Sequence, residues 1–219
     1  ELADELGGAD AFVHAAGTDV PVWWTLRAVR APVLVAWAGG SAAHALHATS
    51  SEQRIARALT SLATLGLIGA GMIALLTHPD ELARLRGEPG LIKPAVEELL
   101  RFTNPVQLVN RYAAEALEVG GVPIPRGSHL VLVLAAANRD PGFVEDGDRL
   151  DLGRGPTQHY AFGQGIHYCV GASLAWLEGE IAFMTLLRRL PNLRLAVPPQ
   201  QVEWRPTVEL RGPSALPVI

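Results

Sequence analysis

One thiol stands in a run of residues whose types suit a cofactor ligand. Residues 161–171 read Ala-Phe-Gly-Gln-Gly-Ile-His-Tyr-Cys-Val-Gly, and Cys169 is the only cysteine among 219 residues. The three glycines of this run admit positive φ angles and let the backbone pass close to a flat ligand. Apolar residues at helical spacing follow over 172–183, so Cys169 is expected in a bend just before a helix. The N–H groups and positive dipole end of that helix stabilise a thiolate, which is a good axial ligand for haem iron.

The alternative interpretation of a lone cysteine is a small, buried hydrophobic residue. The complete pattern Phe-Gly-x-Gly-x-His-x-Cys-x-Gly decides against it, because the pattern resembles the haem-binding loop of the cytochrome P450 superfamily at every fixed position. The resemblance implies a haem b whose iron is bound by Cys169, with His167 beside a haem propionate. One position departs from the family, since bacterial members usually continue Leu-Ala-Arg and this chain has Leu-Ala-Trp176. The other residues that the resemblance assigns to the haem loop are Phe162, Gly163, Gly165 and Gly171.

Two charged residues are predicted to have a structural role. Glu98 and Arg101 lie three positions apart, so on a helix they share a face and can form a bidentate ion pair. Their surroundings, residues 94–102, resemble the family's Glu-x-x-Arg helix, in which the pair is buried and joined by a third arginine. We expect Arg149 to be this third partner, with Arg154 as the reserve.

The resemblance also implies haem contacts outside the cysteine loop. Arg111, ten residues after Arg101, matches a strand position that reaches a haem propionate. Trp23 and Arg27 lie four apart, on one face of a helix predicted after the turn-like residues 17–21. A Trp- or His-x-x-x-Arg helix contacts a propionate in the family, although an amphipathic surface helix explains this pair almost as well.

The family's oxygen-activating motif is missing. Counted back from the His-Pro pair that closes the central helix, Ala-Gly-x-acid-Thr-Thr is expected over 59–64, where this chain reads Leu-Thr-Ser-Leu-Ala-Thr. Leu62 replaces the acid and Ala63 the alcohol, so the usual delivery of protons during dioxygen cleavage is lost. Thr60 and Thr64 remain as candidate catalytic side chains that act through water, and the catalytic residues are otherwise unknown.

Composition narrows the class of protein. Hydrophobic residues make up 49% and charged residues 18%, with 18 basic against 22 acidic side chains, which is typical of a soluble globular protein and gives no basic surface for nucleic acid. One cysteine cannot form an intramolecular disulfide, which favours the cytoplasm. The uncharged runs 31–51 and 61–77 are expected to be buried helices and not membrane anchors. The first residue is Glu1 and not Met, which is compatible with a start part-way into the gene product.

The expected fold is mainly α with small β-sheets, an α+β arrangement like that of the cytochromes P450. We treat 1–219 as a single haem-thiolate domain whose first fifty residues are poorly assigned. The proximal, haem-binding half is best preserved, whereas the distal lid helices between Trp23 and Glu52 are reduced or absent. The elements expected from local patterns are helices at 1–15, 52–76, 79–86 and 91–101, strands within 106–137 around a hairpin connection at 120–127, a loop at 138–151, and short terminal strands at 193–197 and 202–218.

Three functions remain open at this point. The first is a haem-thiolate oxidoreductase, monooxygenase-like, that acts on a small secondary-metabolite substrate, with peroxide-driven or redox-neutral chemistry in place of the usual proton relay. The second is a catalytically silent partner of another pathway enzyme, and the third is an incompletely represented ordinary monooxygenase. The expected partners are a small-molecule substrate, a ferredoxin-type redox protein, and a second subunit or partner enzyme over the open haem face, without nucleic acid or membrane.

Overall fold

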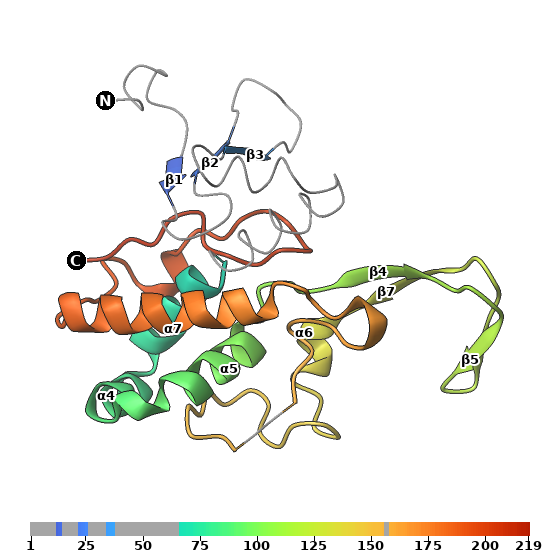
Figure 1. Ribbon diagram of the computed structural model, residues 1–219, viewed down its shortest axis with the longest axis horizontal. Helices are drawn as coiled ribbons and strands as arrows, with labels where there is room; N and C mark the ends of the chain where they lie inside the picture. The colour runs from blue at the N-terminus through green and yellow to red at the C-terminus, as the bar shows by residue number, and fades with distance from the viewer. Residues whose placement is uncertain (1–11, 15–21, 26–33, 38–65, 156–157) are drawn as a thin grey trace.

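The computed structural model describes residues 12–14, 22–25, 34–37, 66–155 and 158–219. Within the described residues, three helices supply most of the hydrophobic core: one covers residues 66–77, and the others are α5 (Ile92–Thr103) and α7 (Ala172–Arg189). Figure 1 shows α5 and α7 side by side, and they pack against each other directly. Within the described residues, no helix combines the length and the apolar character needed to cross a membrane.

The described helix ends lie within two residues of the predicted ones, and the predicted start of the central helix at residue 52 lies outside the described residues. The central helix ends at Thr77, because the ring of Pro79 disfavours helical backbone at the residue before it. Pro79 then opens α4 (Pro79–Gly87), which carries acidic residues in its first turn and arginines in its last. In α5, apolar residues at helical spacing are buried together with both members of the Glu-x-x-Arg pair. A short 3-10 helix, η1 (Pro89–Leu91), joins α4 to α5.

Glycines allow the core helices to approach closely. A Cβ atom on Gly71, in the central helix, would lie 2.6 Å from Cζ of Phe183 in α7, and the Phe183 side chain is fully buried. A Cβ on Gly179, in α7, would lie 3.1 Å from Cγ1 of Val96 in α5. The central helix and α5 therefore both contact α7 at positions where only a hydrogen atom fits.

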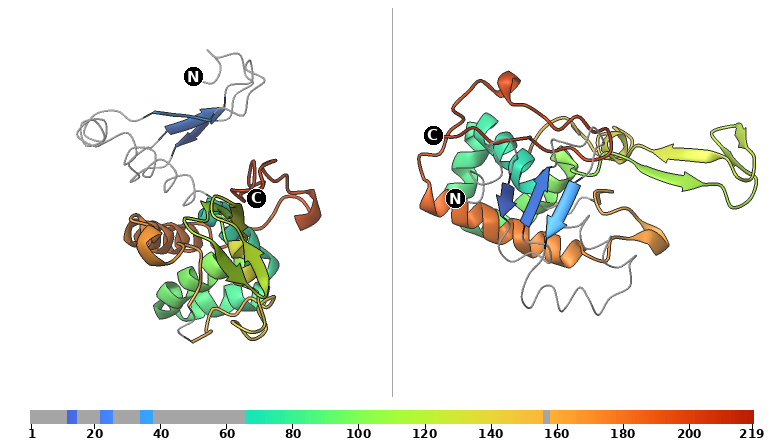
Figure 2. Two further views of the ribbon diagram at one scale, coloured as in Figure 1. Left: turned by 90° about the vertical axis from the view of Figure 1, so that its right-hand side faces the viewer. Right: turned by 90° about the horizontal axis from the view of Figure 1, so that it is seen from above.

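The chain between the helices forms an arm of two small antiparallel sheets. Strand β4 (Val109–Tyr112) pairs with β7 (His129–Leu132), and β5 (Leu117–Val119) pairs with β6 (Val122–Ile124). Gly120 and Gly121 have φ angles of 57° and 80°, which permit the tight turn between β5 and β6. Figures 1 and 2 show the arm projecting sideways from the helices. Its base, at β4, adjoins the end of α5 and so connects the arm to the core.

The predictions for the first fifty residues are wrong where they can be checked. Strands β1 (Phe12–His14), β2 (Val22–Thr25) and β3 (Leu34–Trp37) form an antiparallel sheet in the order β1-β2-β3, in place of the predicted helices over 1–15, after 17–21 and within 31–51. Valine, tryptophan and threonine in β2 are all strand-favouring, and pairing on both sides satisfies the β2 backbone.

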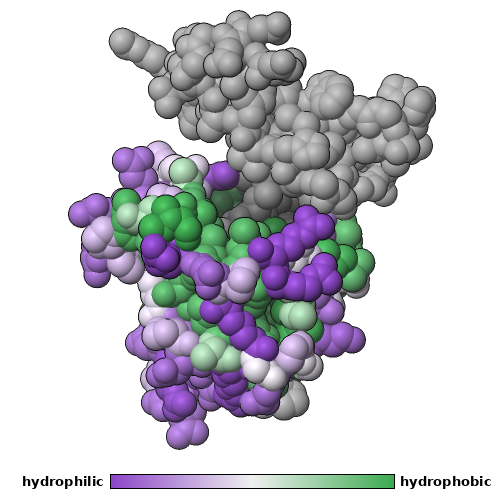
Figure 3. Space-filling view, turned by 90° about the vertical axis from the view of Figure 1, so that its left-hand side faces the viewer, coloured by the Kyte–Doolittle hydropathy of each residue, from purple (hydrophilic) through white to green (hydrophobic). Residues whose placement is uncertain are grey.

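Two further elements differ from expectation. Strands are predicted within 106–137, but the last of them ends at Leu132 and α6 (Leu134–Ala137) follows, because alanine favours helix. The terminal strands reduce to isolated bridges, Leu195 with Val218 and Trp204 with Pro213, around the short 3-10 helix η3 (Pro199–Gln201). Figure 3 shows hydrophobic and hydrophilic residues interspersed over the described part of one face of the molecule.

Candidate cofactor site

The cysteine loop has the backbone that its glycines predict. Gly163 and Gly165 have φ angles of 72° and 75°, a region that residues with a side chain rarely adopt. The 3-10 helix η2 (Gly165–His167) brings the chain back, so that the Cys169 N–H donates to the Phe162 carbonyl oxygen at 3.0 Å. The loop therefore closes on itself and presents Cys169 three residues before α7 begins.

The loop forms one wall of an apolar cavity of about 490 Å³, a size within the range of ~300–1,000 Å³ usual for cofactor sites. Cys169, His167, Phe162 and Gly163 line it from the loop, and Arg111 lines it from β4. The apolar remainder of the lining comes from the central helix, α5, the residues around β4, α6, the cysteine loop and α7: Leu67, Leu100, Pro105, Val106, Val109, Leu134, Ala161, Ile166, Val170 and Ala175.

This set of donors fits a haem. A thiol is a suitable iron ligand, Arg111 and His167 suit carboxylate propionates, and the remaining lining, apart from Tyr168, is mostly apolar, which suits a macrocycle. Within the described part of the chain, no group of three His, Cys, Asp or Glu side chains could hold a metal ion. Cys169, Arg111 and His167, which the sequence predicts as contacts of the haem iron and of its propionates, thus line one cavity together.

Behind the loop, α5 carries a buried ion pair. Arg101 donates to Glu98 through Nε at 2.7 Å and Nη2 at 2.8 Å, and the two side chains are 1% and 3% exposed. The remaining N–H groups of Arg101 donate to the backbone carbonyl oxygens of Asn138, Gly147 and Arg149. One guanidinium thus ties α5 to three points of the segment that leads to the cysteine loop, and all five of its donors are satisfied.

The third member of this cluster is Arg154, the reserve candidate, and the expectation that it is Arg149 is wrong. Arg154 donates to Oε1 of Glu98 through Nε at 3.3 Å, whereas Arg149 contributes its backbone carbonyl oxygen to both guanidiniums. Two further carbonyl oxygens, those of Glu145 and Asp146, accept from Arg154. The turn at 149–154 brings Arg154 back onto α5, a reversal that local spacing does not reveal.

Sequence reasoning missed the residue that joins this cluster to the cysteine loop. Asn138 is fully buried, and its Oδ1 accepts from the Tyr160 N–H at 2.7 Å, two residues before Phe162. Its Nδ2 donates to the Asn104 side chain at the end of α5. The only signal in the sequence was the position of Asn138 at the start of the polar loop 138–151.

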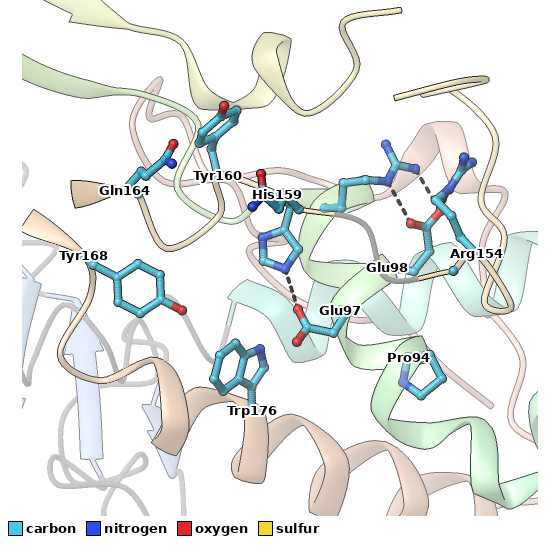
Figure 4. Close-up of a pocket in the computed structure, with 13 residues that line it drawn as sticks. Pro94, Glu97, Glu98, Arg154, His159, Tyr160, Gln164, Tyr168 and Trp176 are labelled. Carbon is cyan, nitrogen blue, oxygen red and sulfur yellow. Dashed lines mark hydrogen bonds and ion pairs between the residues drawn. The ribbon is translucent and has the colours of Figure 1, made fainter. Parts of the chain in front are cut away.

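A second, larger pocket of about 640 Å³ lies on the other side of the loop, and Gly163 and Tyr168 line both pockets. Figure 4 shows the His159 imidazole hydrogen-bonded to Glu97 of α5 at 2.6 Å, with Trp176 of α7 and the Tyr168 hydroxyl turned toward the same space. Burial, then the negative charge of Glu97, then Cys169 raise the pKa of Tyr168 above its ordinary value. Cys169, Arg111 and His167 do not line this larger pocket, so the smaller one is the candidate haem site.

The other predicted site residues lie apart from the cavity or outside the described chain. Gly165 and Gly171 do not line the cavity, and they shape the loop as the first residue of η2 and the N-cap of α7. Trp23 lies in β2 and not in a helix, so the predicted helical face that it shares with Arg27 is not formed. The residues that lie outside the described residues are Arg27, Thr60, Leu62, Ala63 and Thr64.

The cysteine loop is shaped by glycines, lies just before a helix and faces an apolar cavity, and a buried Glu-x-x-Arg cluster supports it from behind. This arrangement is typical of a protein that binds a cofactor through a thiol. The model of one family, described as Cytochrome P450, matches residues 90–210, and this chain belongs to that family. The family implies a haem cofactor.

Relatives and solved structures agree with this assignment. The chain is 47% identical over 156 residues to "Polyketide biosynthesis cytochrome P450 PksS" of Bacillus subtilis. This alignment covers 71% of this chain and 38% of the relative. It is also 47% identical to "6-deoxyerythronolide B hydroxylase" of Saccharopolyspora erythraea, over 71% of this chain and 39% of the relative. The solved structure of PksS matches with a TM-score of 0.69 and 46% identity, over 71% of this chain and 40% of that one. The chain thus spans about two fifths of the length of the curated relatives that it matches.

Proposed function

We propose that this chain is the proximal, haem-binding part of a haem-thiolate monooxygenase that carries haem b with Cys169 as its iron ligand. The observation that carries the proposal is that Arg111 of β4, which is distant in sequence from the cysteine loop, lines the same apolar cavity as His167 and Cys169 of that loop. Haem bound there would supply the redox chemistry for inserting one oxygen atom of dioxygen or peroxide into a substrate.

The roles of the chain's own residues follow from their positions. The Phe162 carbonyl oxygen fixes the Cys169 backbone, and α7 begins three residues later, where its positive end favours a thiolate. Arg111 and His167 offer charge-assisted hydrogen bonds to carboxylates at the rim. The Glu98 and Arg101 pair holds the supporting segment in place and takes no part in the chemistry.

For the substrate we propose a small organic molecule of secondary metabolism. Two of the relatives carry names that point this way, one a polyketide biosynthesis cytochrome P450 and the other a 6-deoxyerythronolide B hydroxylase. A solved relative, P450BioI, is described in complex with a fatty acid ligated to an acyl carrier protein, at 44% identity and a TM-score of 0.68. A screen for substrates should therefore also include small molecules that are attached to an acyl carrier protein. A ferredoxin-type electron donor and a cytoplasmic location belong to the same proposal.

The oxygen donor that we propose is peroxide, because Leu62 and Ala63 cannot relay protons as an acid and an alcohol would. We expect hydrogen peroxide to support turnover of the substrate. With NAD(P)H and a ferredoxin-type partner, we expect the consumption of NAD(P)H to be poorly coupled to product formation. The variant L62E/A63T should raise that coupling. Tightly coupled, NAD(P)H-driven hydroxylation by the unaltered chain would contradict this part of the proposal and return the chain to the ordinary monooxygenases.

A second candidate function is that of a catalytically silent partner of another pathway enzyme. The presence of Leu62 and Ala63 in place of the acid and the alcohol favours this candidate as well. The two candidates differ in one observable, namely whether substrate is consumed with peroxide or with a redox partner. In either case we propose that a second subunit covers the haem face, where side chains of the loop are open to solvent: Ile166 is 97% exposed. Size-exclusion chromatography with light scattering, with and without haem, tests the self-association form of this idea.

A further inference from the structure

One aromatic contact stands out beneath the cysteine loop. The ring of Phe162 meets the indole of Trp176 edge-on, with centroids 5.3 Å apart and planes at 86°. Tyr168 touches the same phenylalanine ring more distantly, at 6.3 Å. Both Phe162 and Trp176 are partly buried and pack against the hydrophobic core. The edge-to-face arrangement is one that aromatic pairs favour, and it fixes the orientation of both rings.

Phe162 connects this contact to the thiol. Its backbone carbonyl oxygen accepts the hydrogen bond of the Cys169 N–H at 3.0 Å, and its side chain lines the cavity beside Cys169. Ile166 and Val170, which line the same cavity, make little contact with the rest of the described chain, since they are 97% and 88% exposed. The position of Cys169 therefore depends on how firmly Phe162 is held from below, and α7 supplies that hold through Trp176.

Trp176 is also the position at which this sequence departs from the Leu-Ala-Arg usual in bacterial members of the family. Arginine is a flexible side chain with a charged end, and it cannot give the fixed edge-to-face contact that an indole gives. In Figure 4 the indole projects from α7 toward the loop, on the side that carries Tyr168. The substitution thus adds an aromatic support under the ligand loop in this particular chain.

We propose that Trp176 is a positioning residue for Cys169 and acts through Phe162. It sets how well the thiolate stays on the iron. The inference rests on the proposed function, because thiolate ligation is the property that Trp176 adjusts.

The experiment compares Trp176→Leu and Trp176→Phe with the unaltered chain, and Trp204→Leu is the matched control. Trp204 is another partly buried tryptophan, which packs against Arg211. We would measure the absorption spectrum of the reduced carbon monoxide complex, the rate of haem loss to an excess of apomyoglobin, and the melting temperature. Trp176→Leu should lose haem about tenfold faster, equivalent to about 1.4 kcal/mol, and should lose part of its thiolate-type band.

The conservative variant and the control separate positioning from general stability. Trp176→Phe keeps an aromatic edge and should stay within about twofold of the unaltered rate, whereas Trp204→Leu should lower the melting temperature without changing the spectrum. If Trp176→Leu does not fold, Trp176→Met, an apolar and adaptable replacement, takes its place.

Two results would overturn the inference: an unchanged spectrum and haem-loss rate in the Trp176→Leu or Trp176→Met variant, or an equal effect of Trp204→Leu. Failure of the proposed function would look different, because the unaltered chain would then show no thiolate-type band at all. A thiolate-type band that is indifferent to Trp176 refutes the inference alone.

Discussion

Removing the Arg101 side chain is the perturbation whose cost the structure defines best. Arg101→Ala deletes five hydrogen bonds: two to Glu98, and one each to the carbonyl oxygens of Asn138, Gly147 and Arg149. Glu98 stays buried, and its carboxylate keeps the longer 3.3 Å contact from Arg154 and the hydrogen bond from the Asp151 N–H at 3.0 Å. Breaking a buried pair from one side costs about 3–5 kcal/mol. With a urea m-value of about 2 kcal/mol/M, the midpoint of unfolding should fall by about 2 M.

Urea unfolding followed by circular dichroism measures this cost, and Arg149→Ala is the matched control. Arg149 is close in space, but the cluster uses only its backbone carbonyl oxygen, so its truncation should change stability by less than about 0.5 kcal/mol. Glu98→Gln keeps the shape and removes the charge, and should cost about 1.5–3 kcal/mol. An unchanged midpoint for Arg101→Ala, or an equal loss in Arg149→Ala, would refute the assignment of the buried cluster.

Two further predictions concern the supporting segment and the cavity rim. A Cβ on Gly147 would lie 2.7 Å from the backbone oxygen of Arg139, so Gly147→Ala should lower the free energy of unfolding in urea by about 1–3 kcal/mol. A Cβ on Gly90 would meet nothing within 4 Å, so the control Gly90→Ala should leave the free energy of unfolding nearly unchanged. Arg111→Ala should weaken haem binding about tenfold in a spectrophotometric titration, equivalent to about 1.4 kcal/mol. The control Arg126→Ala, on the exposed hairpin, should leave the haem affinity unchanged. Equal haem affinities in the two variants would show that Arg111 is not part of the site.

The sequence predicted the elements whose signals are local. Helix ends at Thr77 and Pro79, the face of α5 that carries Glu98 and Arg101, and the loop before α7 all follow from proline, helical spacing and glycine. Each of these depends on residues within one or two turns of one another, so no tertiary information was needed.

The failures involve choices that only distant parts of the chain decide. Whether Arg149 or Arg154 reaches Glu98 depends on how the turn at 149–154 folds back over α5. Trp23 fits a helical face with Arg27 by spacing, but strand partners on both sides of β2 decide the structure there. The burial of Asn138 could not be predicted from local sequence for the same reason, because its hydrogen-bond partners Asn104 and Tyr160 lie 34 and 22 residues away in the chain.

The absorption spectrum of the reduced protein with carbon monoxide tests the central claim most directly, measured for the unaltered chain and for Cys169→Ala and His167→Ala. Thiolate ligation by Cys169 predicts the long-wavelength Soret band of a thiolate-bound haem in the unaltered chain and in His167→Ala, and its complete loss in Cys169→Ala. A band that survives in Cys169→Ala and disappears in His167→Ala would contradict the assignment of Cys169 as the iron ligand.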